Sequence, residues 1–369
     1  MTPRIVFVLG TRPEIVKLAP LVRACDRAAA DYAVVHTGQH YSERLDGVFF
    51  EDLELPEPEY DLGVGSGDHA AQTGEMVAEL GTVIEREAPD AVVVQGDTNS
   101  ALAGGIVASK RDAALAHVEA GLRSFDREMP EELNRVLVDH AADHLFAPTD
   151  DAAAQLRREA IPDDRIEVTG NTVVDAVEQH AALARAKSDV LAELGLANDP
   201  FALLTAHRPG NVDAPERFQG LLDGVAAYAE RRDLSVVYPI HPRSGDAIDE
   251  YDLTVPDRIR CIEPLRFLDF LRLESEAAIV CTDSGGVQEE TCVLGTPCVT
   301  VRENTERPET LAVGSNALAD PTADSIADAA GAVRRGGDWD SPFGDGHAAE
   351  RILATLGVDA PRLTGEVAP

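Results

Sequence analysis

The sequence predicts an α/β protein made of two doubly wound parallel-sheet domains. Short apolar runs alternate with amphipathic helical stretches along the whole chain, which is typical of a parallel sheet covered by helices on both faces. The alternation restarts near residue 201, and 369 residues are enough for two separate cores. Folds of this kind bind ligands beyond the carboxyl ends of their strands, so we expect a cleft site there.

The individual elements follow from the period of the apolar residues. In the first half, we expect strands at residues 5–9, 33–36, 91–95, 114–118, 145–147 and 166–168, and helices at residues 15–29, 70–86, 100–110 and 131–142. In the second half, we expect strands at residues 201–205, 236–239, 259–262, 278–282 and 298–301, and helices at residues 187–194 and 287–294.

The charge balance excludes two classes of partner. Asp and Glu total 66 against 32 Lys and Arg, a formal net charge of −34, so the surface repels nucleic acid and anionic membranes. Apolar residues make up 44% of the chain and occur in regular blocks, which excludes a disordered acidic chain. Lys occurs only at positions 17, 110 and 187, and many acids with few lysines indicate adaptation to multimolar salt.

We therefore expect the melting temperature to rise as KCl is raised towards molar concentration. Salt shortens the Debye length to about 3 Å at ~1 M and so relieves the repulsion between carboxylates. Thermal melts between about 0.1 M and about 2 M KCl measure the effect. An unchanged melting temperature would rule out the halophilic interpretation and leave any enzymatic one intact.

The cysteines and the start of the chain indicate a cytoplasmic protein. The five cysteines are odd in number, form no Cys-x-x-Cys pair and mostly fall in apolar segments, so neither a disulfide nor a metal site is expected. The first expected strand begins at residue 5 with no signal peptide before it, and no apolar run is long enough to span a bilayer.

A nucleotide diphosphate site is expected after the strand at residues 278–282. Ser284-Gly285-Gly286 joins this strand to a helix, whose N-terminal N–H groups an anion can approach closely. Glu290 lies one turn into the helix and its side chain tilts back towards this turn, beside which a ribose diol would sit. Arg307 adds a planar guanidinium suited to phosphate oxygens. The structural alternative is an ordinary tight turn between a strand and a helix, with acidic side chains that are simply solvated.

Further polar residues follow the other strands, namely Arg12 and Lys17, Asp97, Glu119, Glu131 and His207. Each has a structural explanation when taken singly: Asp97 as a helix cap or a turn residue, Glu131 as a charge favoured at a helix start, and His207 as a surface histidine. Together they indicate proton transfer beside a diphosphate leaving group, with crowded carboxylates raising the pKa of a base. No Walker A or complete Gly-x-Gly-x-x-Gly pattern occurs, so nothing points to ATP or NAD.

A set of motifs in fixed order covers nearly the whole chain. They are Gly10-Thr11-Arg12-Pro13-Glu14, Gly96-Asp97-Thr98, His117-Val118-Glu119-Ala120-Gly121-Leu122-Arg123, Pro130-Glu131-Glu132-x-Asn134-Arg135, Gly170-Asn171-Thr172, His207-Arg208, Asp283-Ser284-Gly285-Gly286-x-Gln288-Glu289-Glu290 and Thr305-Glu306-Arg307-Pro308-Glu309. In this combination the chain resembles the non-hydrolysing UDP-N-acetylglucosamine 2-epimerases.

The resemblance implies the GT-B architecture, with two Rossmann-like domains and a C-terminal helix that returns to the first. The first domain would comprise residues 1–170 and about 348–369, and the second residues 171–347. It also implies a homodimer that interconverts UDP-N-acetylglucosamine and UDP-N-acetylmannosamine without a cofactor, neither NAD nor metal. In the family's mechanism the C2 proton is removed while UDP leaves C1, which gives 2-acetamidoglucal, and reprotonation from the other face follows.

Residue roles carry over by position. The family's catalytic set matches Asp97, Glu119, Glu131 and His207. Its UDP-contacting set matches Arg12, Lys17, Phe270, Ser284, Gly285, Gly286, Glu290 and Arg307. Phe270 falls where the family packs against the uracil, although the sequence pattern alone would place it in a helix core.

The chain departs from the family at two places. Arg208 is followed by Pro209-Gly210, where bacterial members often have Arg-Glu. Gln39-His40 is followed by Tyr41-Ser42, where the family usually carries an Arg or another polar residue that helps bind the activating substrate. Both lie near the family's second, activating substrate site, so the resemblance supports catalysis but not allosteric activation.

Three other functions compete. A sister branch acting on UDP-2,3-diacetamido-2,3-dideoxy-glucuronic acid often has Gln in place of Glu14. A GT-B glycosyltransferase would share the Ser284–Glu290 region but would not need the carboxylates of the first domain. A sugar-nucleotide sensor would be expected to have lost one of them.

Overall fold

The computed structural model describes residues 2–39, 43–197, 199–334 and 337–361. They divide into two compact units, Met1–Ala176 with Phe343–Pro369 and Val177–Pro342. The sequence-based expectation had placed the divisions after residues 170 and 347. Each unit contains one fully parallel sheet, so the predicted fold class is confirmed.

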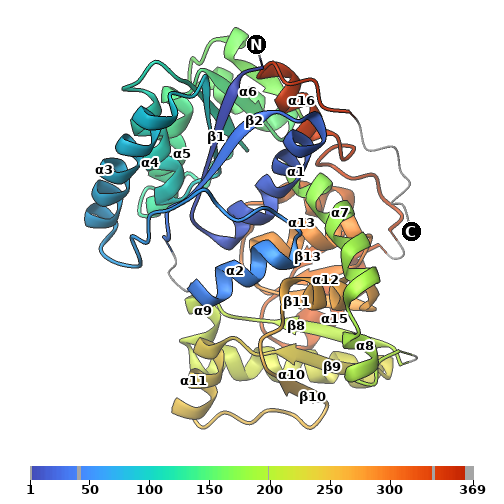
Figure 1. Ribbon diagram of the computed structural model, residues 1–369. Helices are drawn as coiled ribbons and strands as arrows, with labels where there is room; N and C mark the ends of the chain where they lie inside the picture. Colours follow the sequence, from blue (N-terminus) through green and yellow to red (C-terminus); the bar gives the residue numbers. More distant parts are fainter. Residues whose placement is uncertain (1, 40–42, 198, 335–336, 362–369) are drawn as a thin grey trace. The chain divides into compact units, whose positions relative to one another are not determined.

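The first unit has a seven-stranded sheet in the order β3-β2-β1-β4-β5-β6-β7 (Figure 1). Its strands are β1 Arg4–Leu9, β2 Asp31–His36, β3 Tyr60–Asp61, β4 Ala91–Gln95, β5 Ala114–Val118, β6 His144–Ala147 and β7 Ile166–Val168. Its helices are α1 Arg12–Ala28, α2 Glu43–Asp52, α3 His69–Glu87, α4 Asn99–Ala108, α5 Pro130–Ala141, α6 Asp150–Arg158, the 3-10 helix Asp163–Arg165 and α16 Ala348–Thr355, while α7 Thr172–Lys187 contains the division between the units.

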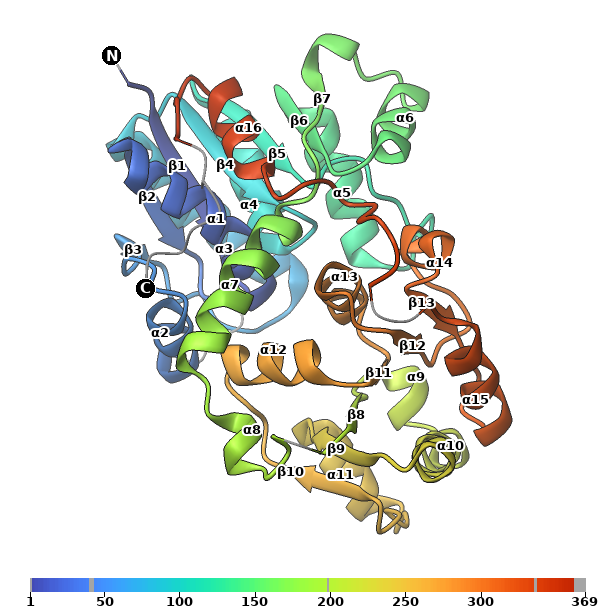
Figure 2. The same ribbon diagram turned by 90° about the vertical axis from the view of Figure 1, so that its right-hand side faces the viewer.

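Helices cover both faces of this sheet because its central strands are apolar on both sides. Val6 and Val8 of β1 pack in one core cluster with Met76 of α3 and Val138 of α5. Helices α1 and α16 lie side by side, as Figures 1 and 2 both show.

The second unit has a six-stranded sheet in the order β10-β9-β8-β11-β12-β13. Its strands are β8 Phe201–Thr205, β9 Ser235–Pro239, β10 Ile259–Ile262, β11 Ile279–Thr282, β12 Cys298–Thr300 and β13 Asn316–Leu318. Its helices are α8 Val190–Glu193, α9 Pro209–Val212, α10 Pro215–Arg232, α11 Pro242–Glu250, α12 Phe267–Glu276, α13 Gly285–Leu294, α14 Pro308–Val313 and α15 Ala323–Ala332.

Each sheet has one point where the strand order reverses. In the first unit the chain runs outwards from β1 to β3 and then in the other direction from β4 to β7. In the second unit the reversal lies between β8 and β11. The loops after these two pairs of strands diverge to opposite faces of the sheet, which is where open α/β sheets bind their ligands.

The C-terminal helix is attached to the first unit through Asp175 of α7. The Asp175 carboxylate accepts hydrogen bonds from the backbone N–H groups of Ala348 and Ala349 at the start of α16, at 3.2 and 2.9 Å. Burial raises the pKa of Asp175 to about 6, against the lowering effect of these two hydrogen bonds. Residues 362–369 of the expected C-terminal helix lie outside the described residues.

The sequence pattern was wrong in the region that joins the two units. Instead of one helix at residues 187–194, α7 ends at Lys187 and α8 covers Val190–Glu193. The hydroxyl of Ser188 donates to Asp269 at 2.5 Å and accepts from the N–H of Val190 at 3.4 Å, so this side chain takes part in the break between the helices. No helix in the described part of the chain is long and apolar enough to cross a membrane.

Candidate functional site

The residues that the sequence predicts for the site fall on both units. The first unit carries Arg12, Lys17, Asp97, Glu119 and Glu131, and the second carries His207, Phe270, Ser284, Gly285, Gly286, Glu290 and Arg307. Most of them lie on the loops that follow β1, β4, β5, β8 and β11, or one turn into the next helix.

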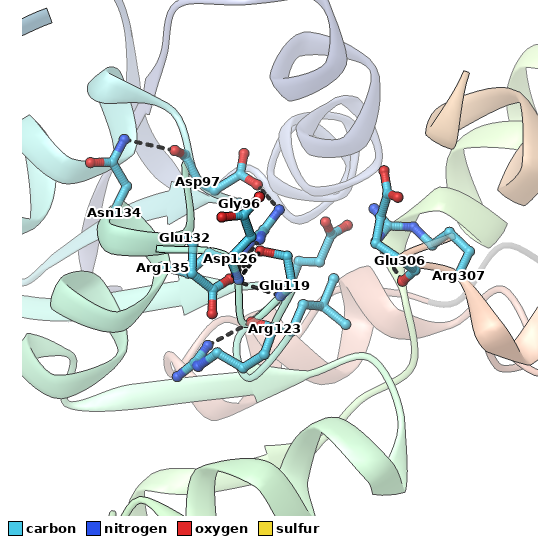
Figure 3. Close-up of polar contacts among 12 residues, drawn as sticks. Gly96, Asp97, Glu119, Arg123, Asp126, Glu132, Asn134, Arg135, Glu306 and Arg307 are labelled. Carbon is cyan, nitrogen blue, oxygen red and sulfur yellow. Dashed lines mark hydrogen bonds and ion pairs between the residues drawn. The ribbon is translucent and has the colours of Figure 1, made fainter. Parts of the chain in front are cut away.

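Asp97 lies in the turn between β4 and α4. Gly96 before it has φ +69°, and Thr98 after it caps α4 by accepting a hydrogen bond from the N–H of Ala101 at 3.0 Å. The Asp97 carboxylate forms an ion pair with Arg135, while its backbone carbonyl accepts from the Asn134 side chain at 2.9 Å (Figure 3). Since Thr98 is the cap, the structural explanation of Asp97 as a helix cap is wrong, whereas the other structural explanation, a turn residue, matches its position.

Glu119 forms a buried ion pair with Lys17, on the loop after β5. Their side chains are 8% and 10% exposed, so little water competes with the contact. Glu119 has φ +69°, a left-handed conformation that costs a non-glycine residue free energy and that occurs at active sites as well as in turns and helix caps. Asp97 and Glu119 are thus each stabilised as anions by a cation. The sequence had indicated the opposite influence, a pKa raised by neighbouring carboxylates.

Glu131 is half-buried in the first turn of α5, and its neighbour Glu132 is buried. Glu132 accepts hydrogen bonds from the backbone N–H groups of Ser124 and Phe125, at 2.8 and 3.1 Å, and pairs with Arg135. These contacts fix the loop before α5, so the two adjacent glutamates have different roles and only Glu131 remains a candidate for chemistry.

The loop after β1 carries Arg12 and is held by Glu14. Arg12 is exposed, with its guanidinium 5.4 Å from the centre of the Phe49 ring. Glu14 is 1% exposed and accepts hydrogen bonds from the N–H of Gly10 at 3.0 Å and the hydroxyls of Thr11 and Thr98 at 2.8 and 2.7 Å. Burial raises the pKa of Glu14 to about 7 although these donors lower it. Glu14 therefore connects the Arg12 loop to the turn that carries Asp97.

In the second unit, His207 follows β8 and is oriented by Asp283, which follows β11. The Asp283 carboxylate is fully buried and lies 3.2 Å from Nδ1 of His207. It also accepts from the backbone N–H groups of His207 and Arg208 and from the Asn211 side chain. Burial raises the pKa of Asp283, but the contacts with His207, Arg208 and Asn211 outweigh it and leave that pKa lowered.

The turn between β11 and α13, which the sequence predicts to bind phosphate, has the expected form. Ser284 precedes α13 with a side chain that does not cap it, and Gly286 at the second position of the helix is exposed. A Cβ on Gly285 would lie 2.9 Å from a carboxylate oxygen of Glu306, so a larger residue there would displace that side chain. The first turn of α13 thus keeps its backbone accessible to an anion.

Arg307 is anchored on one side. Its Nε lies 2.7 Å from the buried carboxylate of Glu289. Its Nη1 donates to the carbonyl of Glu306 at 3.3 Å (Figure 3). These contacts restrain one side of the guanidinium, whose planar fork suits a bidentate phosphate contact.

Glu290 lies next to Glu274 of α12, and Phe270 is itself a residue of α12; both stand at predicted site positions. Glu290 is half-buried, and burial together with the charge of Glu290 raises the pKa of the fully buried Glu274 well above its usual value. Phe270 is half-buried and packs against the core cluster that contains Leu273, as the sequence pattern alone predicted. Residues 40–42, at one departure from the family pattern, lie outside the described residues.

Sequence reasoning missed the buried residues that orient the site. Asp283 was noted only as part of a motif, and Asp139 of α5 was not noted at all. Their partners, His207 and His117, lie 76 and 22 residues away in the sequence. The available signal was position: Asp283 directly follows β11, whose Thr282 pairs with Thr205 of β8, two residues before His207.

Two parallel α/β units, one with cation-paired carboxylates at its switch point and the other with a glycine-rich helix start, define a GT-B protein of the nucleotide-sugar class. The model of the family described as UDP-N-acetylglucosamine 2-epimerase matches residues 23–357. The chain belongs to this family.

Individual relatives agree with the family match. A UDP-N-acetylglucosamine 2-epimerase of Methanocaldococcus jannaschii is 47% identical over 95% of this chain and 98% of its own. A UDP-2,3-diacetamido-2,3-dideoxy-D-glucuronate 2-epimerase of Pseudomonas aeruginosa is 36% identical over 96% of this chain and 99% of its own. The crystal structure of the M. jannaschii UDP-GlcNAc 2-epimerase in complex with UDP-GlcNAc and UDP has a TM-score of 0.86, at 47% identity, covering 96% of this chain and 99% of that one.

Proposed function

We propose that this protein interconverts UDP-N-acetylglucosamine and UDP-N-acetylmannosamine by eliminating UDP and adding it back through 2-acetamidoglucal. The observation that carries the proposal is the pair of cation-bound carboxylates, Asp97 with Arg135 and Glu119 with Lys17, on the loops after two neighbouring strands of one sheet. A glycosyltransferase or a binding protein would not need these carboxylates. Near-full-length similarity to 2-epimerases supports the same function.

The residues divide into two functional groups. Asp97, Glu119 and Glu131 are proposed to move the proton at C2, since a positioned carboxylate can act as a general acid or base. His207, held by Asp283, is proposed to act in the same step or on the departing phosphate. Arg307 and the N-terminus of α13, with Ser284, Gly285 and Gly286, are proposed to stabilise the diphosphate as it leaves. Arg12, Lys17, Phe270 and Glu290 complete the proposed substrate contacts.

Proton NMR in heavy water tests the function. Purified protein in high salt, with UDP-N-acetylglucosamine and no added NAD or metal, should form UDP-N-acetylmannosamine and replace the C2 hydrogen by deuterium. Transfer of the sugar to an acceptor without exchange at C2 would identify a glycosyltransferase instead.

The sister substrate is the second candidate, favoured by one relative at 36% identity. It differs from the first by a 3-acetamido group and a C6 carboxylate. Glu14 favours UDP-N-acetylglucosamine, because members of the sister branch often have Gln at this position. Turnover of the diacetamido uronate alone in the same NMR assay would reassign the protein to that branch.

We further propose a cytoplasmic homodimer. All five cysteines are free, which fits a reducing compartment. Leu133 and Leu137 on one face of α5 are 39% and 56% exposed, and Ile106 on the neighbouring α4 is 37% exposed. Exposed apolar side chains that gather in this way are typical of an interface between protein chains.

The homodimer is tested by replacing Leu137 with Glu, which should dissociate it because a charge would be buried in the contact. Light scattering after gel filtration in molar KCl measures the mass. The change Leu55→Glu, at a half-buried position outside α5, serves as the control. A monomeric wild type, or a Leu137→Glu variant that remains dimeric, would contradict the assignment.

A further inference from the structure

A buried cluster of four charged side chains connects the two turns that carry Asp97 and Glu119. It consists of His117 of β5, Asp139 of α5, Arg123 and Glu159. The side chains of His117, Asp139 and Arg123 are at most 2% exposed. A buried charge costs free energy unless it is paired, so such a cluster needs an explanation. The proposed reaction does not use it.

Both ring nitrogens of His117 face hydrogen-bond acceptors. Nε2 lies 2.8 Å from the backbone carbonyl of Gly96, and Nδ1 lies 2.7 Å from a carboxylate oxygen of Asp139. A carbonyl oxygen can only accept, so Nε2 must carry a proton. Nδ1 then also carries one, unless Asp139 is itself protonated.

The surroundings of Asp139 favour its ionised form. Its second oxygen accepts from the N–H of Gly121 at 3.2 Å and lies 2.7 Å from Arg123. Burial raises the pKa of Asp139, but His117 and Arg123 outweigh burial and leave that pKa below its usual value. Arg123 is in turn paired with Glu159, so the cluster holds two carboxylates and one guanidinium, and a positive charge on His117 would make it neutral.

We infer that His117 is held as a doubly protonated imidazolium that fixes the Gly96 carbonyl and, through Asp139, the Glu119–Gly121 turn. His117 is therefore a positioning residue for the two carboxylates of the proposed reaction. Gly96 precedes Asp97 directly, and Gly121, with φ +88°, lies two residues after Glu119. One buried side chain thus fixes the backbone position of two turns, the one after β4 and the one after β5. The positioning role rests on the proposed function, because that function assigns the two carboxylates to the reaction. The protonation state of His117 can be measured without any activity.

Nitrogen NMR of the ligand-free protein tests the protonation state. With ¹⁵N-histidine labelling, His117 should show both ring nitrogens protonated at neutral pH, and its signal is assigned by its loss in His117→Gln. A singly protonated ring in the wild type would overturn the inference, whether or not the protein is an epimerase.

Kinetics tests the positioning role. His117→Gln should lower kcat by about 10- to 100-fold, because misplacement of a reacting group by about 1 Å has an effect of that size, and should leave KM and UDP affinity unchanged. His140→Gln is the matched control, since His140 is an exposed histidine of α5. A His117→Gln variant that binds UDP and turns over like the wild type would overturn the role.

A second variant keeps the test valid if His117→Gln does not fold. In Asp139→Asn, the amide oxygen can accept from Gly121 and Arg123 while the amide nitrogen donates to a neutral His117. Every hydrogen bond is then preserved and only the charge is lost. The nitrogen spectrum should change to a singly protonated ring with the proton on Nε2. A doubly protonated ring in this variant would show that Asp139 does not hold the charge.

Discussion

Asp97→Asn and Glu131→Gln should each reduce epimerisation by about 100-fold or more while leaving the affinity for UDP unchanged. Both changes remove a base but keep the size of the side chain and its capacity for hydrogen bonding. In Asp97→Asn, Arg135 keeps its contact with Glu132 at 3.1 Å, and the bond from Asn134 goes to the backbone of residue 97. The turn should therefore keep its shape, and the loss should be one of chemistry.

Arg307→Ala provides the contrast. It removes a phosphate contact that substrate, intermediate and product share, so it should weaken UDP binding itself. Calorimetric titration of UDP beside the epimerisation assay separates the two effects. Glu128→Gln, an exposed residue shortly before α5, is the matched control for Glu131→Gln. Wild-type turnover in both carboxylate variants would show that Asp97 and Glu131 are structural.

The second large effect concerns Glu14 and pH. A carboxyl whose pKa in the folded state exceeds its value in the unfolded state stabilises the fold below the unfolded pKa, and this stabilisation is lost as pH rises through the folded pKa. For Glu14 the window runs from 4.5 to about 7. Since one pKa unit corresponds to ~1.4 kcal/mol, the wild type should lose about 3 kcal/mol across this window relative to Glu14→Gln.

Glutamine suits this position. Its oxygen can accept from Gly10 and Thr11 while its nitrogen donates to the hydroxyl oxygen of Thr98. Urea denaturation in high salt, from about pH 4.5 to pH 7.5, gives the difference in free energy of unfolding between the two proteins. Glu85→Gln, an exposed residue of α3, should show no such trend. Parallel curves for wild type and Glu14→Gln would mean that Glu14 does not titrate in this range.

The sequence predicted most strands because a buried parallel strand is an uninterrupted apolar run. The strands β4, β5, β7, β8 and β10 have the bounds that the pattern predicts. It missed β3 and β13, since Tyr60–Asp61 and Asn316–Leu318 are too short and too polar to form such a run. The order of the strands is a long-range property, and no local pattern specifies it.

The same limit applies to the site. Residues just after strands could be identified because a parallel sheet gathers them at one edge. Their partners could not, because Lys17 and Glu119 are 102 residues apart and Arg135 and Asp97 are 38 apart. The pairing of the two candidate carboxylates with cations is therefore a finding of the structure, as is the buried histidine between the two turns.

The junction beside α16 has a consequence for how the chain is organised. The N–H of Asn171 donates to the carbonyl of Phe343 at 2.8 Å, and a Cβ at Gly170 would lie 3.2 Å from the same carbonyl. The chain therefore leaves the first unit and re-enters it at one point, so the second unit is an insertion with both ends fastened together. Its ends are already brought together by the first unit, which lowers the loop-closure entropy for that segment. A bulkier residue at Gly170 should therefore destabilise the second unit, although residue 170 lies in the first unit and does not contact the core of the second.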